Sequence, residues 1–324
     1  MSSLTLGSWS PPQGHACPIC GGHQVVFQGT QRDRRRGLTG EWTFWECAAC
    51  SALFQYPIPS DDELRAFYAG YSNGSALRLS PTAGSRHDVL RRLYHLFSGD
   101  VDPRDFVKVS ARARVLDYGC GVAPYISHFR SRGVLISGAD ITPSVVDAYQ
   151  AAGMHVSLIQ RLEEIPFADA EFDVVYMMQV LEHIARPNDL LQEVNRVLKP
   201  AGVLYVAVPN AKSPWRRIFG KYWVAGWFAP YHVFAYSQQP ISVLAAAHGF
   251  EVAQSWSSTP ESWLRLNMKA WLHRSNNRLD FLVGSWVDYL PVRMALAVAL
   301  RLTEAFTTER DCLVLALKKI SPQC

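Results

Sequence analysis

The chain has 324 residues, of which 48% are hydrophobic and 19% charged, and its formal net charge is +4 at pH 7. This composition excludes a wholly disordered chain, and the length suffices for two domains or for one domain with an added module. The mild positive charge argues against a dedicated nucleic-acid binder, which usually carries a stronger basic footprint.

The cysteines and the N-terminal residues bear on the cellular compartment. The N-terminal residues lack a basic stretch followed by an apolar run, and an uninterrupted apolar segment of about 18 residues is absent. We therefore expect a cytoplasmic protein without a transmembrane helix. Four of the seven cysteines form two Cys-x-x-Cys pairs, which in a reducing compartment indicate metal binding rather than disulfides.

Residues 1–58 are predicted to form a zinc ribbon. The four candidate ligands are Cys17, Cys20, Cys47 and Cys50. Each pair forms a knuckle that directs two thiolates at one ion, and two knuckles supply the four tetrahedral ligands that zinc prefers. Short strands are expected at 25–27 and 42–45. Because four cysteines leave no ligand position for water, we expect a structural zinc ion. The alternative is one redox pair and one incidental pair.

A run of four arginines, within Arg32–Arg36, lies between the knuckles. We expect it at the tip of a hairpin and interpret it as a solvated loop. A contact with phosphate or RNA is the alternative.

Residues 59–110 are predicted to form a linker and cap helices. Ser60 and Glu63 constitute a capping box at the start of the first helix, and a second helix is expected at 86–97. These helices would cover the mouth of the following domain.

Residues 111–324 are predicted to form a doubly wound α/β domain. Strands are expected at 114–120, 135–141, 172–178 and 202–209, and helices at 122–132, 143–152 and 187–198. Strands separated by single helices build a parallel sheet, and such sheets bind ligands at the carboxyl ends of their strands.

A glycine turn follows the first of these strands. Gly119 and Gly121 allow the backbone to approach a ligand closely, and Asp117 can accept a hydrogen bond from an ammonium group. Asp140 ends the second strand, where a carboxylate can bind both hydroxyls of a ribose. A dinucleotide-binding enzyme stays open on this element alone, although Pro124 stands where a third glycine would lie. Strand-end capping is the structural alternative for both aspartates.

Five blocks of sequence resemble the class I S-adenosylmethionine-dependent methyltransferases in their order and spacing. They are Val115-Leu-Asp-Tyr-Gly-Cys-Gly121, Gly138-Ala-Asp-Ile141, Ile165-Pro-Phe-Ala-Asp-Ala-Glu-Phe-Asp-Val-Val175, Val180-Leu-Glu-His-Ile184 and Val197-Leu-Lys-Pro-Ala-Gly-Val-Leu204. The resemblance implies a seven-stranded Rossmann-like sheet that binds S-adenosylmethionine and transfers its methyl group to an acceptor.

The resemblance also implies the residues of the donor site. They are Asp117, Gly119, Cys120, Gly121, Asp140, Ile141, Leu162 and Gln179. Asp117 and the glycines would line the methionine end together with Gln179, while Asp140 would hold the ribose and Ile141 would pack on the adenine. Family members carry an acidic residue for the adenine amino group where this chain has Arg161. We expect the Leu162 backbone or Glu163 to substitute.

His183 and His232 are the candidate general bases for an acceptor hydroxyl, because imidazole titrates near neutrality. The residues around His232 resemble the Pro-x-His-x-x-x-(Phe/Tyr)-Ser stretch of related methyltransferases with an N-terminal zinc ribbon. Either histidine could instead be structural, with its ring bonded to the backbone. Segment 179–183 contains one carboxylate, Glu182, which disfavours the magnesium site that some relatives build from two.

Residues 210–237 are expected to form a lid over the acceptor site, because the segment is too aromatic for an ordinary loop. Its basic residues, Lys212, Arg216, Arg217 and Lys221, would suit an acceptor that carries phosphate.

A helical insertion is expected at 259–310, between two strands that the resemblance implies to pair antiparallel at the sheet edge. Segment 291–306 is apolar on most sides. A buried cap helix or a homodimer surface is the first interpretation, and peripheral membrane contact is the second.

The sequence thus predicts a methyltransferase that acts on a small-molecule, saccharide or lipid-linked acceptor, with O-methylation preferred. The alternatives are an rRNA or tRNA base methyltransferase whose ribbon binds RNA, and a non-enzymatic binding protein on the same fold. Because a fold does not fix an acceptor, its identity does not follow from the sequence.

Overall fold

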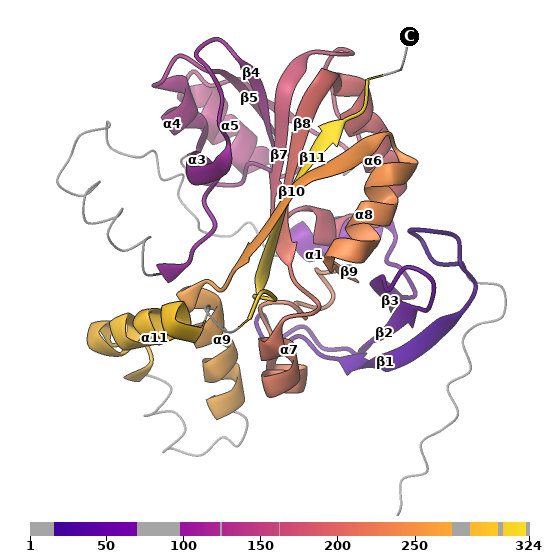
Figure 1. Cartoon of the computed structure of the whole chain (residues 1–324), viewed down its shortest axis with the longest axis vertical. Helices are drawn as coiled ribbons and strands as arrows, with labels where there is room; N and C mark the ends of the chain where they lie inside the picture. The colour runs from indigo at the N-terminus through magenta and orange to yellow at the C-terminus, as the bar shows by residue number, and fades with distance from the viewer. Residues whose placement is uncertain are drawn as a thin grey trace, which may run out of the picture.

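The computed structural model describes residues 16–69, 98–123, 125–161, 163–273, 286–303 and 307–321. Within these ranges the chain forms a seven-stranded sheet and a four-stranded sheet, which lie one above the other in Figure 1. The helix expected at 86–97, Pro124 and Leu162 lie outside the described residues.

The larger sheet has the strand order β10-β11-β8-β7-β4-β5-β6. Its strands are β4 (Arg114–Tyr118), β5 (Leu135–Asp140), β6 (Val156–Leu158), β7 (Phe172–Met178), β8 (Leu198–Pro209), β10 (Phe250–Ser258) and β11 (Cys312–Lys319). The five strands from β8 to β6 are parallel, and β11 runs antiparallel to both β8 and β10. The predicted seven-stranded, doubly wound fold is confirmed. The sequence did not predict β6, which has only three residues.

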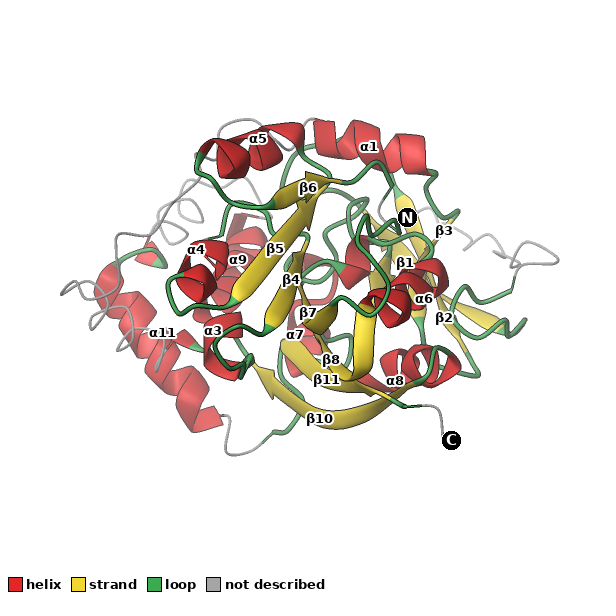
Figure 2. Ribbon diagram, turned by 90° about the horizontal axis from the view of Figure 1, so that it is seen from above, coloured by secondary structure: helices red, strands yellow, loops and turns green. Residues whose placement is uncertain are grey.

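Helices cover both faces of this sheet, as Figures 1 and 2 show. The covering helices are α4 (Tyr125–Arg130) and α5 (Pro143–Ala151) on one face, and α6 (Pro187–Val197) and α8 (Gln238–Ala247) on the other. In α6 the apolar side chains recur every three or four residues, so that Leu190, Val194 and Val197 are fully buried. Two further helices, α1 (Asp61–Ala69) and α3 (Pro103–Phe106), precede β4.

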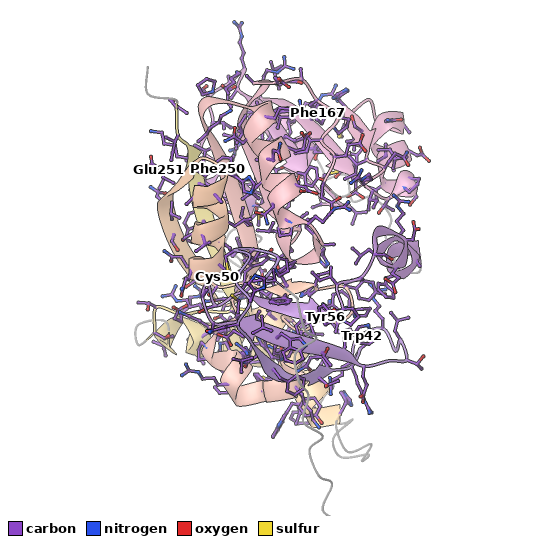
Figure 3. The ribbon with its side chains drawn as sticks, turned by 90° about the vertical axis from the view of Figure 1, so that its right-hand side faces the viewer. Trp42, Cys50, Tyr56, Phe167, Phe250 and Glu251 are labelled. Carbon is purple, nitrogen blue, oxygen red and sulfur yellow. The ribbon has the colours of Figure 1, made fainter. Side chains whose placement is uncertain are left out.

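The smaller sheet joins the N-terminal ribbon to a distant segment. Its order is β1-β2-β3-β9, formed by β1 (Val25–Gln31), β2 (Trp42–Cys47), β3 (Leu53–Tyr56) and β9 (Phe234–Ala235). The strands predicted at 25–27 and 42–45 lie within β1 and β2. Cys50 packs in one core with residues of the larger sheet, near the junction of the sheets in Figure 3. The boundary expected at residue 58 therefore separates elements that share a sheet and a core.

The segment expected as a lid, 210–237, is packed into the protein. It contains the short helix α7 (Pro214–Phe219) and a single 3-10 turn (Gly220–Tyr222). Trp223 is fully buried, and its Nε1 donates a hydrogen bond of 2.7 Å to Asp311 Oδ1. Because burying an indole requires a partner for its N–H group, this bond fixes the segment against the strand end.

The insertion at 259–310 is helical, as predicted, with α9 (Glu261–Leu272) and α11 (Leu290–Thr303). The two helices pack together beside the lower end of the sheet in Figure 1. On α11, Ala297 and Leu300 are buried, whereas Val298 and Leu302 are exposed. None of the helices that the structure describes has the length and apolar composition needed to cross a membrane.

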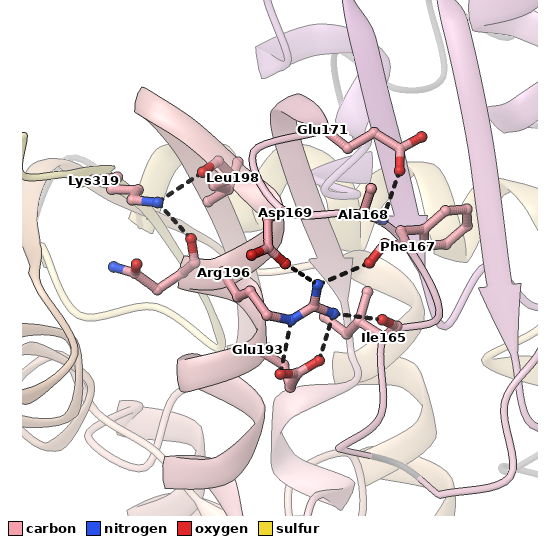
Figure 4. A network of polar contacts seen from close by, with 10 residues as sticks. Ile165, Phe167, Ala168, Asp169, Glu171, Glu193, Arg196, Leu198 and Lys319 are labelled. Carbon is pink, nitrogen blue, oxygen red and sulfur yellow. Dashed lines mark hydrogen bonds and ion pairs between the residues drawn. The ribbon is translucent and has the colours of Figure 1, made fainter.

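Arg196, near the end of α6, fixes the segment that leads into β7 (Figure 4). Its guanidinium donates hydrogen bonds of 2.9 Å to the backbone carbonyls of Ile165 and Phe167. It also donates bonds of 2.7 Å to the carboxylates of Asp169 and Glu193. A planar guanidinium with five donors can satisfy all four groups at once.

We predict that Arg196→Ala lowers the free energy of unfolding by about 1–3 kcal/mol, because two backbone carbonyls and two carboxylates lose a charged donor. Urea denaturation measures this change. Lys318→Ala, at an exposed position on β11, is the matched control and should change it by less than about 0.5 kcal/mol. Equal stabilities of the two variants would contradict the role assigned to Arg196.

Candidate active site

The glycine turn after β4 has the backbone that its sequence requires. Gly119 and Gly121 have φ angles of +73° and +52°, a region that favours glycine. A β-carbon at Gly119 would also lie 2.5 Å from Val180 Cγ2. The turn is closed by Asp140, whose Oδ2 accepts a hydrogen bond of 2.8 Å from the Gly121 N–H, while its Oδ1 accepts one from Thr142 N–H. Asp140 thus caps the strand end, and each oxygen retains a lone pair for a ligand.

A cavity of about 520 Å³ opens at the carboxyl ends of β4 and β7. Five predicted donor residues line it: Asp117, Gly119, Cys120, Gly121 and Gln179. Asp140 and Ile141 adjoin the turn without lining this cavity. We refer to it as the donor cavity. The structure therefore brings together the residues expected at the methionine end, while the ribose and adenine contacts of Asp140 and Ile141 stay predictions.

Asp117 points a buried carboxylate at the donor cavity. The side chain is 2% exposed, and its Oδ2 accepts no hydrogen bond from the described residues. Burial raises the pKa of this carboxyl group to about 7; the adjacent Tyr176 hydroxyl opposes the rise and the neighbouring Asp140 adds to it. A cationic group in the cavity would satisfy the oxygen and return the pKa towards its usual range. The site therefore fits an ammonium group.

Of the two residues expected to replace the family's acidic contact to adenine, Glu163 lies within the described residues and Leu162 does not. Glu163 is buried and forms an ion pair of 2.8 Å with Arg186. One carboxylate oxygen of Glu163 is thereby occupied, and Arg161 is exposed.

Several lining residues were not singled out from the sequence. Asp102 caps α3 by accepting a hydrogen bond of 2.9 Å from the Arg104 N–H, and both residues line the donor cavity. The Asp-Pro dipeptide is a recognisable helix-start signal that could have identified this cap. Trp263, on α9, also lines the cavity. The position of Trp263 depends on how the 259–310 insertion packs against the sheet, and the sequence has no local pattern that predicts this packing.

A second cavity, of about 420 Å³, adjoins the first. Gln179 and Trp263 line both. Gln179 has a φ angle of +57°, which is uncommon for a residue with a side chain and typical of functional sites. We refer to the second cavity as the acceptor cavity. Its lining includes His183 and His232, so the structure brings both predicted bases to one place.

The histidine rings have defined tautomers. His183 Nδ1 lies 2.8 Å from the Tyr231 carbonyl oxygen, and His232 Nδ1 lies 2.8 Å from the Gly226 carbonyl oxygen. A carbonyl oxygen can only accept, so each Nδ1 carries the hydrogen and each Nε2 of the neutral ring holds a lone pair. The backbone contact that the structural alternative requires is therefore present, and it also prepares Nε2 as a proton acceptor.

Burial keeps this histidine pair neutral. It lowers the pKa of His183 to about 4 and holds the pKa of His232 well below its usual range. The expectation that these imidazoles titrate near neutrality is therefore wrong, because burial disfavours their charged forms. Beside them, Glu182 is fully buried, and neither of its carboxyl oxygens forms a hydrogen bond with the described residues. Burial raises the pKa of Glu182 to about 8. Glu182, His183 and His232 each offer an atom that could bind a metal ion, and these atoms lie within 4.8 Å of one another. The sequence argument against a magnesium site counted only carboxylates near Glu182 and did not consider His232 as a further ligand.

The arginine run lies in the hairpin loop between β1 and β2, and Arg32, Arg35 and Arg36 are exposed there, as expected for a solvated loop. One of its side chains also reaches a cavity. The Arg35 guanidinium carbon lies 3.9 Å from the Phe228 ring centroid, and Arg35 lines the acceptor cavity. The predicted basic residues of 210–237 do not line it. Arg216, for example, lies over the ring of Trp227, at 5.1 Å from its centroid. The cations at this cavity come instead from the ribbon, with Arg35, and from α9, with Arg265 and Lys269.

The four ribbon cysteines converge on one point. The distances Cys17 Sγ–Cys50 Sγ and Cys20 Sγ–Cys47 Sγ are both 3.6 Å, and all four sulfurs lie within 4.8 Å of one another. A disulfide requires about 2.05 Å. Four thiolates bound to zinc at about 2.3 Å in a tetrahedron would be about 3.8 Å apart. The spacing therefore fits a tetrahedral metal ion.

Comparison with known proteins identifies the sequence family. The family described as "Methyltransferase domain" matches residues 84–255, more than half of the chain. A ubiquinone biosynthesis O-methyltransferase from Xanthomonas oryzae pv. oryzae is 30% identical over 31% of this chain and 44% of its own length. A malonyl-[acyl-carrier protein] O-methyltransferase from Enterobacter lignolyticus is 31% identical over 44% of this chain and 57% of its own length.

The chain thus spans about half the length of these curated relatives. Among solved structures, an S-adenosylmethionine-dependent methyltransferase from Archaeoglobus fulgidus is 19% identical, with a TM-score of 0.44 over 73% of this chain and 95% of that chain. That likeness is too distant to support an argument.

We predict that Glu182→Gln stabilises the protein more at pH 8 than at pH 5. Because the folded-state pKa is raised to about 8, the unfolded chain loses its proton first as pH rises above about 4.5. The wild-type protein therefore loses stability between these values, and glutamine removes that loss. Urea unfolding at both pH values tests this. Glu251→Gln, at an exposed position on β10, is the control and should show no such difference.

Proposed function

The chain belongs to the methyltransferase-domain family, and on this premise we propose that it transfers a methyl group from S-adenosylmethionine to a hydroxyl group of a small-molecule acceptor. The observation that carries the proposal is the junction of the two cavities at Gln179. On one side lies a buried carboxylate suited to an ammonium group, and on the other lie two neutral imidazoles. Both relatives described above carry the name O-methyltransferase.

The chemistry that these residues support is an in-line displacement. The acceptor oxygen attacks the methyl carbon, the bond from that carbon to the sulfonium sulfur breaks, and the sulfur keeps the electron pair. The hydroxyl proton passes to a histidine Nε2, for which His232 is our first choice and His183 the second. The protein's main contribution is to hold the two reactants in line and away from water.

The placement of the arginine run favours a small acceptor over RNA. Arg34 lies 5.4 Å from the centroid of the Tyr222 ring, and Arg35 lies over Phe228. Arg34 thus lies against the 210–237 segment and Arg35 at the acceptor cavity, whereas an RNA-binding ribbon would present both along an extended backbone of phosphates. The donor cavity and its orphaned Asp117 oxygen likewise favour an enzyme over a protein that only retains the fold.

We further propose that the four-cysteine cluster holds a structural zinc ion. The sulfur spacing supports it, and with four cysteine ligands the ion has no open position for chemistry. The ribbon has little core of its own, so the metal would contribute to its folding.

We predict that His232→Ala lowers methyl transfer by about 10²–10⁴-fold, the usual contribution of a general base, and leaves donor binding unchanged. Transfer is measured with labelled S-adenosylmethionine and the small-molecule fraction of a cell extract, and binding by calorimetry with S-adenosylhomocysteine. His155→Ala, at an exposed position that lines neither cavity, is the control. A fully active His232→Ala variant would remove this residue from catalysis, and a wild-type protein without affinity for S-adenosylhomocysteine would refute the proposed function.

We predict that Cys50→Ser reduces the zinc content from about one ion per chain to a small fraction of that and lowers the thermal midpoint. Elemental analysis of the purified protein and a thermal melt provide the two readings. Cys312→Ala removes a buried cysteine outside the cluster and should retain the metal. Equal metal content in the two variants would count against the zinc site.

A further inference from the structure

Three cationic side chains meet in the acceptor cavity. Arg265 and Lys269 come from α9, and Arg35 comes from the hairpin between β1 and β2 of the ribbon. Arg35 lies more than two hundred positions before the two α9 residues in the sequence, and the fold alone brings it to the same cavity. The described residues that line the cavity include no aspartate or glutamate.

The position of Arg35 is fixed from two directions. Its guanidinium carbon lies 3.9 Å from the centre of the Phe228 ring, and stacking of this kind leaves the N–H donors at the edge of the guanidinium group. The loop that carries it is closed by Asp33, whose Oδ1 accepts hydrogen bonds of 2.8 and 2.9 Å from the N–H groups of Arg35 and Arg36. The exposed Arg35 side chain is therefore positioned at the rim of the cavity by its contact with Phe228 and by the backbone of its loop.

The two cations of α9 are positioned by a carboxylate outside the lining. Arg265 and Lys269 both form ion pairs with Asp288, and Arg265 also lies 3.3 Å from Glu261 Oε1. Neither carboxylate lines the acceptor cavity. Asp288 and Glu261 thus partly offset the charge of the α9 cations. Arg35 adds a third cation to a lining whose described residues include no carboxylate, so an anionic ligand group would be favoured.

We propose that the acceptor cavity binds a diphosphate group on the methyl acceptor, with Arg35 of the ribbon as a residue that determines acceptor specificity. This inference rests on the proposed function. Guanidinium groups recognise phosphate oxygens through paired hydrogen bonds, and an ammonium group adds a point charge. The acceptor hydroxyl would then lie towards His183 and His232, between the diphosphate and the donor cavity.

Calorimetry with two diphosphates tests the inference without a known acceptor. Uridine diphosphate and farnesyl diphosphate share the anionic group and differ in what it carries, so their relative affinities distinguish a nucleotide-linked from a lipid-linked acceptor. We expect at least one to bind with one site per chain in the presence of S-adenosylhomocysteine. Arg35→Ala should weaken that binding by about tenfold or more, which corresponds to about 1.4 kcal/mol. Arg35→Lys, which keeps the charge without the paired donors, should fall between.

Arg36→Ala is the matched control, because it removes a cation from the same loop that does not line the cavity. It should bind the diphosphate as the wild type does. S-Adenosylhomocysteine binding is measured for every variant, which separates this inference from the proposed function. Binding of S-adenosylhomocysteine with no binding of either diphosphate would overturn only the present inference. So would an Arg35→Ala variant that binds as tightly as the wild type.

Discussion

Two backbone hydrogen bonds join three of the four segments that build the acceptor cavity, the ribbon, 179–183 and 225–235; the fourth is α9. Gln55 N–H, in β3 of the ribbon, donates to the Val233 carbonyl at 2.7 Å, and Val233 N–H donates to the Glu182 carbonyl at 2.8 Å. One residue on, Phe234 pairs with Phe54 as β9 adds to the ribbon sheet. This short ladder holds the rings of His183 and His232 4.6 Å apart and brings the ribbon hairpin over them. Its atoms are all main-chain, so it depends on the segments being buried together.

Burial by the same ladder sets the electrostatics of the site. The histidines become neutral acceptors and Glu182 a neutral acid at physiological pH, because Glu182 and His232 are buried, His183 is partly buried, and each charged form loses solvation. A neutral base suits a reaction in which the donor already carries a positive charge, since a second cation beside the sulfonium would be unfavourable. The cations of the cavity lie instead on α9 and the ribbon hairpin, both of which are distant in sequence from the donor motif.

The donor half could be predicted from sequence because its signals are local. Gly119, Gly121 and Asp117 act within one turn after one strand, and alternation of strands and helices fixes which strand ends meet. The acceptor half could not, because its residues come from segments whose contacts have no local signature. The basic residues of 210–237 were expected at the acceptor on charge alone, and the structure has Arg35 there instead. Trp263 was missed for the same reason.

The ribbon illustrates how a metal module can matter to a site that it does not enter. A closed four-cysteine cluster performs no chemistry, yet Cys17 and Cys50 pack in the core that continues through Phe54 to Phe234. Loss of that core would separate β3 from β9. His232 would then lose its alignment, and Arg35 would no longer be held near the acceptor cavity. If acceptor recognition resides in the hairpin, then the ribbon and the insertion can vary to suit an acceptor while the glycine turn and Asp117 stay unchanged. The same separation explains why the donor is evident from the sequence and the acceptor is not.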